Sequence, residues 1–199
     1  MGGGAVSLNW IELLGAVLGL IQIVLLVLRS KWNFPVAMVM VSLIGVTLFE
    51  ARLYSEAGLQ AFFFVVNAIG WAQWQRAQDP HSAVPVSWMR WPERALWAAI
   101  TVVLSLSLGW IMQRFTNAAL PFADSAVTGA SIAAQLLLNN RRIENWILWV
   151  AIDVGSIVLY QYRGLHFLAV LYVAFLVISV IGLRQWIRSG SAAKAEVFQ

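Results

Sequence analysis

Long apolar stretches alternate with short polar connections along almost the whole of this chain. The stretches cover residues 9–28, 34–53, 58–75, 93–113, 122–139, 143–161 and 164–187. A helix needs about 20 predominantly apolar residues to cross the hydrocarbon core of a bilayer, and all seven stretches approach this length. Because unpaired backbone groups are costly in lipid, each crossing is expected to be helical. The pattern predicts an all-α integral membrane protein with seven transmembrane helices.

The sequence also repeats itself when it is shifted by 112 residues. Asn33 then pairs with Asn145, and GWAQW at 70–74 pairs with GLRQW at 182–186. The shift crosses four spans, an even number, so both three-helix units point the same way through the membrane. The sequence therefore predicts two parallel three-helix repeats joined by a linker helix. Transporters with parallel repeats place their site between the repeats.

This repeat divides the chain into four segments. Residues 1–76 are the first three-helix bundle, 77–117 a cytoplasmic linker with the helix that inverts the chain, 118–188 the second bundle, and 189–199 a cytoplasmic tail. Lys and Arg resist transfer across the membrane, so loops rich in them stay in the cytoplasm. Ten of the 13 fall on one side: Arg29, Lys31, Arg76, Arg90, Arg94, Arg141, Arg142, Arg184, Arg188 and Lys194. We expect an external N-terminus and a cytoplasmic C-terminus.

The composition supports the membrane assignment and excludes other classes. The chain is 61% hydrophobic and 11% charged, whereas about 25% of residues are charged in soluble domains. It contains no cysteine, so disulfide scaffolds and thiolate metal sites are excluded. Its basic residues lie in loops rather than along one face, so we expect the lipid bilayer as a partner and no nucleic acid. The first ten residues lack a signal-peptide pattern, so we expect the first span to be retained.

Polar and aromatic residues follow one helical face of the sixth span. They are Asn145, Trp149, Asp153, Ser156 and Tyr160, with Trp146 on the flank. Two indoles beside an amide and a carboxylate can hold a flat ring and its polar or cationic groups. In the alternative interpretation, the Trp residues anchor the helix at the membrane interface and Asp153 is a hydrogen-bonded packing group. We favour a ligand site because an ionisable group inside a membrane is costly to keep.

Two further spans carry polar stripes at helical spacing. The fifth has Asp124, Thr128, Ser131 and Gln135, and the third has Gln60, Asn67, Trp71 and Trp74. Each stripe either lines a path or forms hydrogen bonds between packed helices. The spans that hold the acids Glu12, Asp124 and Asp153 contain no Lys or Arg. A cationic or weakly basic substrate would balance them, as would protonation.

Catalytic chemistry has little support in this sequence. His81 lies in the polar linker and His166 near a helix start, without further residues at metal-ligand spacing. No phosphate-binding loop or nucleophile motif is present. We therefore predict no catalytic residue, no metal and no cofactor. A membrane-embedded enzyme acting on lipids and a small scaffold subunit are the alternatives from other classes.

Four stretches resemble the PnuC family of bacterial vitamin-precursor transporters. They are KWNFP at 31–35, GLQAFFFVVNAIGW at 58–71, RRIENWILWVAID at 141–153 and LYQYRGLHFLAVLYVAFLV at 159–177. The best-known members carry nicotinamide riboside. The resemblance implies a fold like that of the SWEET sugar transporters, a homotrimer in the bacterial inner membrane, and facilitated diffusion. It also implies that a cytoplasmic kinase traps the vitamin by phosphorylation.

Carried over position by position, the resemblance implies several ligand contacts. They are Gln135, Asn145, Trp146, Trp149 and Tyr172. With Asp153, Tyr160, Asn67 and Trp71 from the polar stripes, this gives nine predicted substrate-binding residues. The chain departs from the family at Ile69, where an aromatic residue is common. Thiamine and riboflavin, which are also flat heteroaromatic vitamins, are therefore alternatives to nicotinamide riboside.

Overall fold

Seven α-helices make up most of the protein in a computed structural model, which describes residues 10–50, 54–77, 84–116, 120–162, 164 and 166–196. The helices are α1 (Trp10–Val27), α2 (Asn33–Glu50), α3 (Tyr54–Ala77), α4 (Trp91–Phe115), α5 (Pro121–Asn139), α6 (Glu144–Tyr162) and α7 (His166–Glu196). The predicted all-α fold is confirmed, and no strand occurs in the described ranges. Only α7 departs clearly from its predicted bounds, because it continues as a helix well beyond residue 187.

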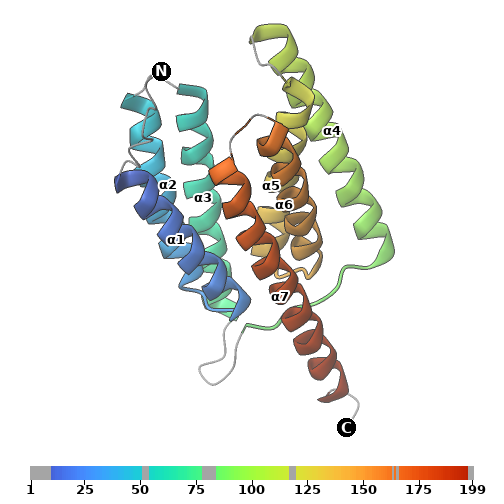
Figure 1. Ribbon diagram of the computed structural model, residues 1–199. Helices are drawn as coiled ribbons and strands as arrows, with labels where there is room; N and C mark the ends of the chain where they lie inside the picture. Colours follow the sequence, from blue (N-terminus) through green and yellow to red (C-terminus); the bar gives the residue numbers. More distant parts are fainter. Residues whose placement is uncertain are drawn as a thin grey trace.

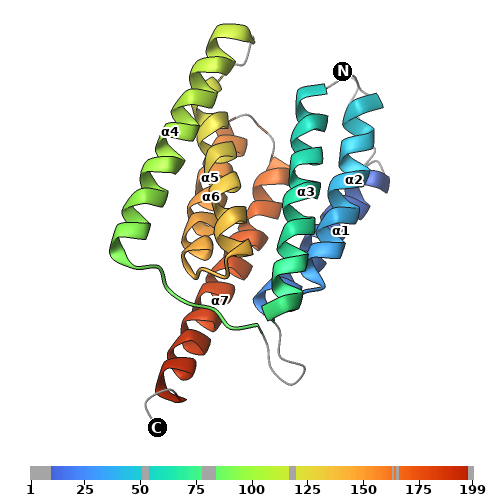
Figure 2. The same cartoon turned by 180° about the vertical axis from the view of Figure 1, so that it is seen from behind.

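The six helices of the two repeats form a closed ring. Within the halves, α2 packs between α1 and α3, and α6 packs between α5 and α7. The halves meet where α1 packs against α7 and where α3 packs against α5. The first helix of each half thus contacts the third helix of the other, as two parallel repeats around one axis require. Helix α4 lies outside the ring beside α5 (Figures 1 and 2).

Small residues let α4 approach α5 closely. A Cβ added at Gly109 of α4 would clash with the Phe122 ring, and one added at Gly129 of α5 would clash with Ser105. Helices in membranes commonly associate through such small positions because apolar surface alone gives no advantage in lipid. The fifth span, rich in Ala, Ser and Thr, is therefore covered by α4 on its outer side and by its ring neighbours α3 and α6 on its other sides.

Hydropathy differs between the helices according to what each faces. In the described part of the chain, two segments are long and apolar enough to span a bilayer by themselves: Trp91–Phe115 and Leu168–Gly190, each with mean hydropathy 2.0. By contrast, α5 buries Ser125, Gln135 and Asn139 inside the protein. Polar residues that face neighbouring helices lower the hydropathy of a span without exposing it to lipid.

Helices α1 and α5 end in the same unusual way. Arg29 and Arg141 follow them with positive φ angles of 55° and 58°, where glycine is the usual residue. In α1, the Ser30 N–H donates to Leu25 O at 2.9 Å and the Arg29 N–H to Leu26 O at 2.9 Å. The equivalent bonds recur after α5. Both turns lie at the end of the bundle where α1, α3, α5 and α7 finish and most cations gather, which we name the basic end.

Candidate functional site

Four aromatic side chains fill the centre of the helix ring near the basic end of the bundle. Phe34, Trp74, Trp146 and Trp186 are each fully buried, and we name this group the aromatic plug. Phe34 packs edge-on against Trp74 with centroids 5.2 Å apart. Trp146 packs edge-on against Trp186 at 5.7 Å. The two Trp residues of α3 and α7 then meet at 6.0 Å. The repeat relates one pair to the other, so the plug contains one edge-on pair from each half.

Hydrogen bonds from the plug tie the two halves together. The Trp74 indole N–H donates to Leu138 O at 3.3 Å and to Asn139 O at 3.2 Å. The Trp186 indole N–H donates to Leu26 O at 3.3 Å. The last carbonyls of a helix have few partners within that helix. Each third helix therefore supplies a donor to the end of the first helix in the opposite half.

Glycine at two repeat-related positions makes room for the plug. A Cβ at Gly182 would lie 2.5 Å from the Trp146 ring. A Cβ at Gly70 would lie 2.5 Å from both the Phe34 ring and the Asn139 side chain. These distances are far shorter than van der Waals contact. The repeated glycine and tryptophan of GWAQW and GLRQW are therefore explained by packing.

Four of the predicted site residues have buried polar atoms that no described residue hydrogen-bonds. Asn145 donates to Arg142 O at 2.5 Å, but its Oδ1 accepts nothing among the described residues. The indole N–H groups of Trp71, Trp146 and Trp149 are also buried without an acceptor there. All three indoles belong to one apolar cluster or pack against it. A buried polar group without a partner costs about 1–3 kcal/mol, and these atoms are hydrogen-bonding positions that the described residues leave open.

The predicted residues Asn67 and Gln135 meet in a second group, between α3 and α5. Gln135 Nε2 donates to Asn67 Oδ1 at 3.2 Å and to Asn139 Oδ1 at 3.3 Å. Asn139 Nδ2 donates in turn to Val66 O at 2.8 Å. All three amides are buried. Asn139 was not among the predicted residues. The repeat could not have indicated it, because the equivalent position in the first half is the apolar Val27.

A third group joins α6 to α7 farther from the basic end. The Ser179 hydroxyl donates to Asp153 Oδ2 at 2.8 Å, with both residues buried. The Tyr160 and Tyr172 rings lie 5.2 Å apart, and Phe175 packs edge-on against Tyr172. Ser179 was also not predicted. The shift of 112 residues pairs Ser179 with Asn67, a predicted site residue, so the repeat could have indicated Ser179 as well.

The nine predicted residues therefore lie at several depths along the bundle. Asn145 and Tyr160 are 15 positions apart in α6, which corresponds to about 22 Å along a helix. A single small ligand cannot touch both ends at once. Of the other residues considered above, His166 is exposed and contacts Gln161, whereas His81 and the Glu12 side chain lie outside the described residues.

A cavity of about 510 Å³ lies away from these groups, at the basic end between α4 and α5. None of the nine predicted residues lines it. Its walls come from residues 85–89, the first turns of α4, and the end of α5 with the residues that follow. This cavity is separate from the polar and aromatic groups inside the ring.

A ring of helices in two parallel repeats, with polar and aromatic residues at successive depths inside it, is the architecture of a multi-pass membrane transporter. Comparison with known families makes the class specific. The chain belongs to the nicotinamide mononucleotide transporter family, whose model matches residues 9–188.

Individual relatives agree with this membership. The nicotinamide riboside transporter PnuC of Escherichia coli (strain K12) is 31% identical over 214 residues, covering 95% of this chain and 90% of that protein. The riboflavin/roseoflavin transporter RibM of Streptomyces davaonensis is 28% identical, covering 89% of this chain and 84% of that protein. The crystal structure of the vitamin B3 transporter PnuC superposes with a TM-score of 0.76 at 24% identity, covering 92% of this chain and 83% of that one. The solved structure confirms the fold.

Proposed function

We propose that this protein is a uniporter that carries nicotinamide riboside into the cytoplasm by facilitated diffusion. The observation that carries the proposal is the group of unpartnered polar atoms around the plug. Asn145 Oδ1 and the N–H groups of Trp71 and Trp149 are buried without partners among the described residues. A pyridinium carboxamide matches them, because its ring stacks on indoles while its amide and the ribose hydroxyls form hydrogen bonds. The riboside named for the Escherichia coli relative has this chemistry.

Charge favours a riboside over a nucleotide. Helices α1, α2, α5 and α6 contain no Lys or Arg, and α3 and α7 carry theirs only toward the basic end. A phosphate dianion crossing the ring would have no cationic partner there, and such a group is costly to bury. The buried carboxylate of Asp153 accepts a hydrogen bond from Ser179 and has no basic partner among the described residues. It favours a ligand that carries a positive ring.

We further propose that the basic end faces the cytoplasm, with the N-terminus outside, because Lys and Arg are retained on that side. The aromatic plug then closes the cytoplasmic exit in the present conformation. Rocking of the repeats would separate the Trp74 and Trp186 donors from the opposite half and open that exit. Trapping by a cytoplasmic kinase and a homotrimeric assembly complete this proposal, both on the basis of the family resemblance.

Uptake of labelled nicotinamide riboside into proteoliposomes tests the site and the mechanism. Uptake should be saturable and unaffected by ion gradients, and Asn145→Ala and Trp149→Ala should each lower it at least tenfold. Asn33→Ala is the matched control. Asn33 donates to Ser30 O as Asn145 does to Arg142 O, and its Oδ1 is likewise buried without a partner among the described residues, but Ala37 stands where the second half has Trp149. Equal losses in the two Asn variants would reduce Asn145 to a structural role. Accumulation driven by a pH gradient would rule out uniport.

Riboflavin is the second candidate substrate, because the Streptomyces davaonensis relative is named for it. Its isoalloxazine ring is also flat and edged with hydrogen-bonding groups, and the thiamine ring system has the same general character. Competition for the labelled riboside by riboflavin, thiamine and nicotinamide mononucleotide separates the candidates. Stronger competition by riboflavin than by unlabelled riboside would reassign the substrate.

A further inference from the structure

Arg141 occupies a backbone position that disfavours arginine. Its φ of 58° lies in the left-handed region, which costs a non-glycine residue roughly 1 kcal/mol. Arg29, its equivalent in the first half, has the same conformation. In Arg29 the side chain has an evident role, because its Nη1 donates to Val84 O at 3.4 Å and so reaches the segment before α4.

The Arg141 side chain, in contrast, has no partner among the residues that the structure describes. Its backbone carbonyl accepts from the Ser87 N–H at 3.1 Å, but its guanidinium makes no hydrogen bond or ion pair with any described residue. Arg141 instead lines the cavity of about 510 Å³ between α4 and α5. An arginine held at a disfavoured backbone position and directed to an open cavity is well placed to bind an anion from outside the protein.

The cavity is cationic on one wall and apolar on another. Its cationic wall is Arg141 and Arg142, and its one acid, Glu93, lies 3.6 Å from the Arg142 guanidinium. The apolar wall includes Leu96 and Trp97 of α4. Within the described part of the chain, Arg142 is therefore already paired with an acid, whereas the Arg141 guanidinium has no protein partner.

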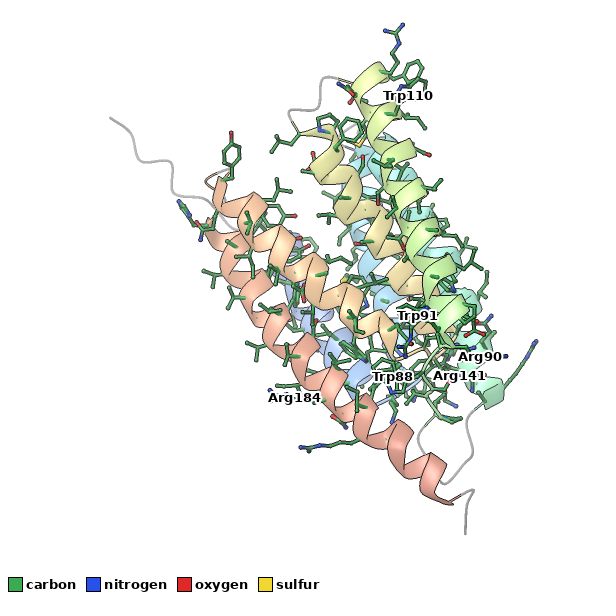
Figure 3. The ribbon with its side chains drawn as sticks, turned by 90° about the vertical axis from the view of Figure 1, so that its right-hand side faces the viewer. Trp88, Arg90, Trp91, Trp110, Arg141 and Arg184 are labelled. Atoms are coloured by element: carbon green, nitrogen blue, oxygen red, sulfur yellow. The ribbon has the colours of Figure 1, made fainter. Side chains whose placement is uncertain are left out.

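The position of the cavity relative to the membrane indicates which kind of anion it could bind. Figure 3 shows Arg141 beside Trp88, Arg90 and Trp91 at one end of α4, with Trp110 at the other end. Trp side chains at the two ends of a span mark the two headgroup levels. Helix α4 between them is apolar, and only 6% of the residues in its apolar window are buried, so lipid chains can lie along it. Basic pockets between helices at headgroup depth are typical binding sites for anionic lipids.

We propose that this cavity binds the headgroup phosphate of an anionic phospholipid, with Arg141 as its main contact and the acyl chains along α4. Phosphatidylglycerol is the probe, with phosphatidylcholine as the comparison. Native mass spectrometry of the purified protein should show retained phosphatidylglycerol, which should also raise the Tm in detergent. Arg141→Gly should weaken this binding about fivefold, the amount expected for one arginine at an anionic surface.

Arg141→Gly is chosen because glycine suits a positive φ, so the variant should fold at least as well as the parent without lipid. Arg114→Gln, at the opposite end of α4, is the matched control and should keep full lipid binding. Unchanged phosphatidylglycerol binding in Arg141→Gly would overturn the proposal. It would also be overturned if phosphatidylcholine bound equally well, or if inorganic phosphate alone gave the same rise in Tm.

Discussion

The buried carboxylate of Glu144 links the second repeat to the start of α4 and the segment before it. Its Oε1 accepts the Met89 backbone N–H at 2.9 Å and Arg94 Nε at 2.8 Å. The Glu144 side chain is 9% exposed, whereas that of Arg94 is 39% exposed. Glu144→Gln keeps an acceptor for Met89 but removes the charge that faces Arg94. The perturbation therefore isolates the ionic part of this link.

The expected loss in the free energy of unfolding depends on how exposed Glu144 and Arg94 are. Breaking a fully buried ion pair costs about 3–5 kcal/mol, because one charge is left buried alone. Arg94 is partly solvated and recovers some hydration, so we expect Glu144→Gln to cost about 1.5–2 kcal/mol. Glu93→Gln is the matched control. Its carboxylate lies 3.6 Å from Arg142 and the two side chains are 32–42% exposed, so we expect about 0–0.5 kcal/mol.

Thermal unfolding in detergent, followed by intrinsic fluorescence, measures both variants. For a chain of this size, 1 kcal/mol corresponds to about 2–4 °C. Glu144→Gln should therefore lower the Tm by about 3–8 °C and Glu93→Gln by less than about 2 °C. Raising the salt concentration should leave most of the difference in place, since buried pairs are weakly screened. Equal Tm shifts in the two variants would refute the reasoning.

Two further predictions concern packing and the buried carboxylate. Gly182→Ala should destabilise the protein by about 1–3 kcal/mol, because its Cβ would overlap the Trp146 ring. The control is Gly155→Ala, whose Cβ would have nothing within 4 Å and which should be neutral or mildly stabilising. Equal Tm values of the two variants would contradict this prediction. Ser179→Ala should cost about 1–3 kcal/mol by removing the hydrogen bond to Asp153. The effect should shrink in an Asp153→Asn background, and a double-mutant cycle of unfolding without coupling would contradict the bond.

Part of the candidate site could be predicted from the sequence and part could not. Asn145, Trp149 and Asp153 were found because one helical face repeats every three to four residues, and the structure places all three in α6. The sequence gave no sign that Asn139 joins the amide group, because that contact depends on α3 packing against α5. The role of the nine residues in binding stays a prediction for the uptake assay.

Local hydropathy and internal repetition were sufficient to determine the seven spans and their parallel pairing. Lipid requires each crossing to satisfy its own backbone, so span positions are a local property of the chain. Only the tertiary structure decided the ring order, the crossed bonds of Trp74 and Trp186, and the burial of Glu144. These features join residues far apart in sequence. Their partners are chosen by packing between helices, which no single span encodes.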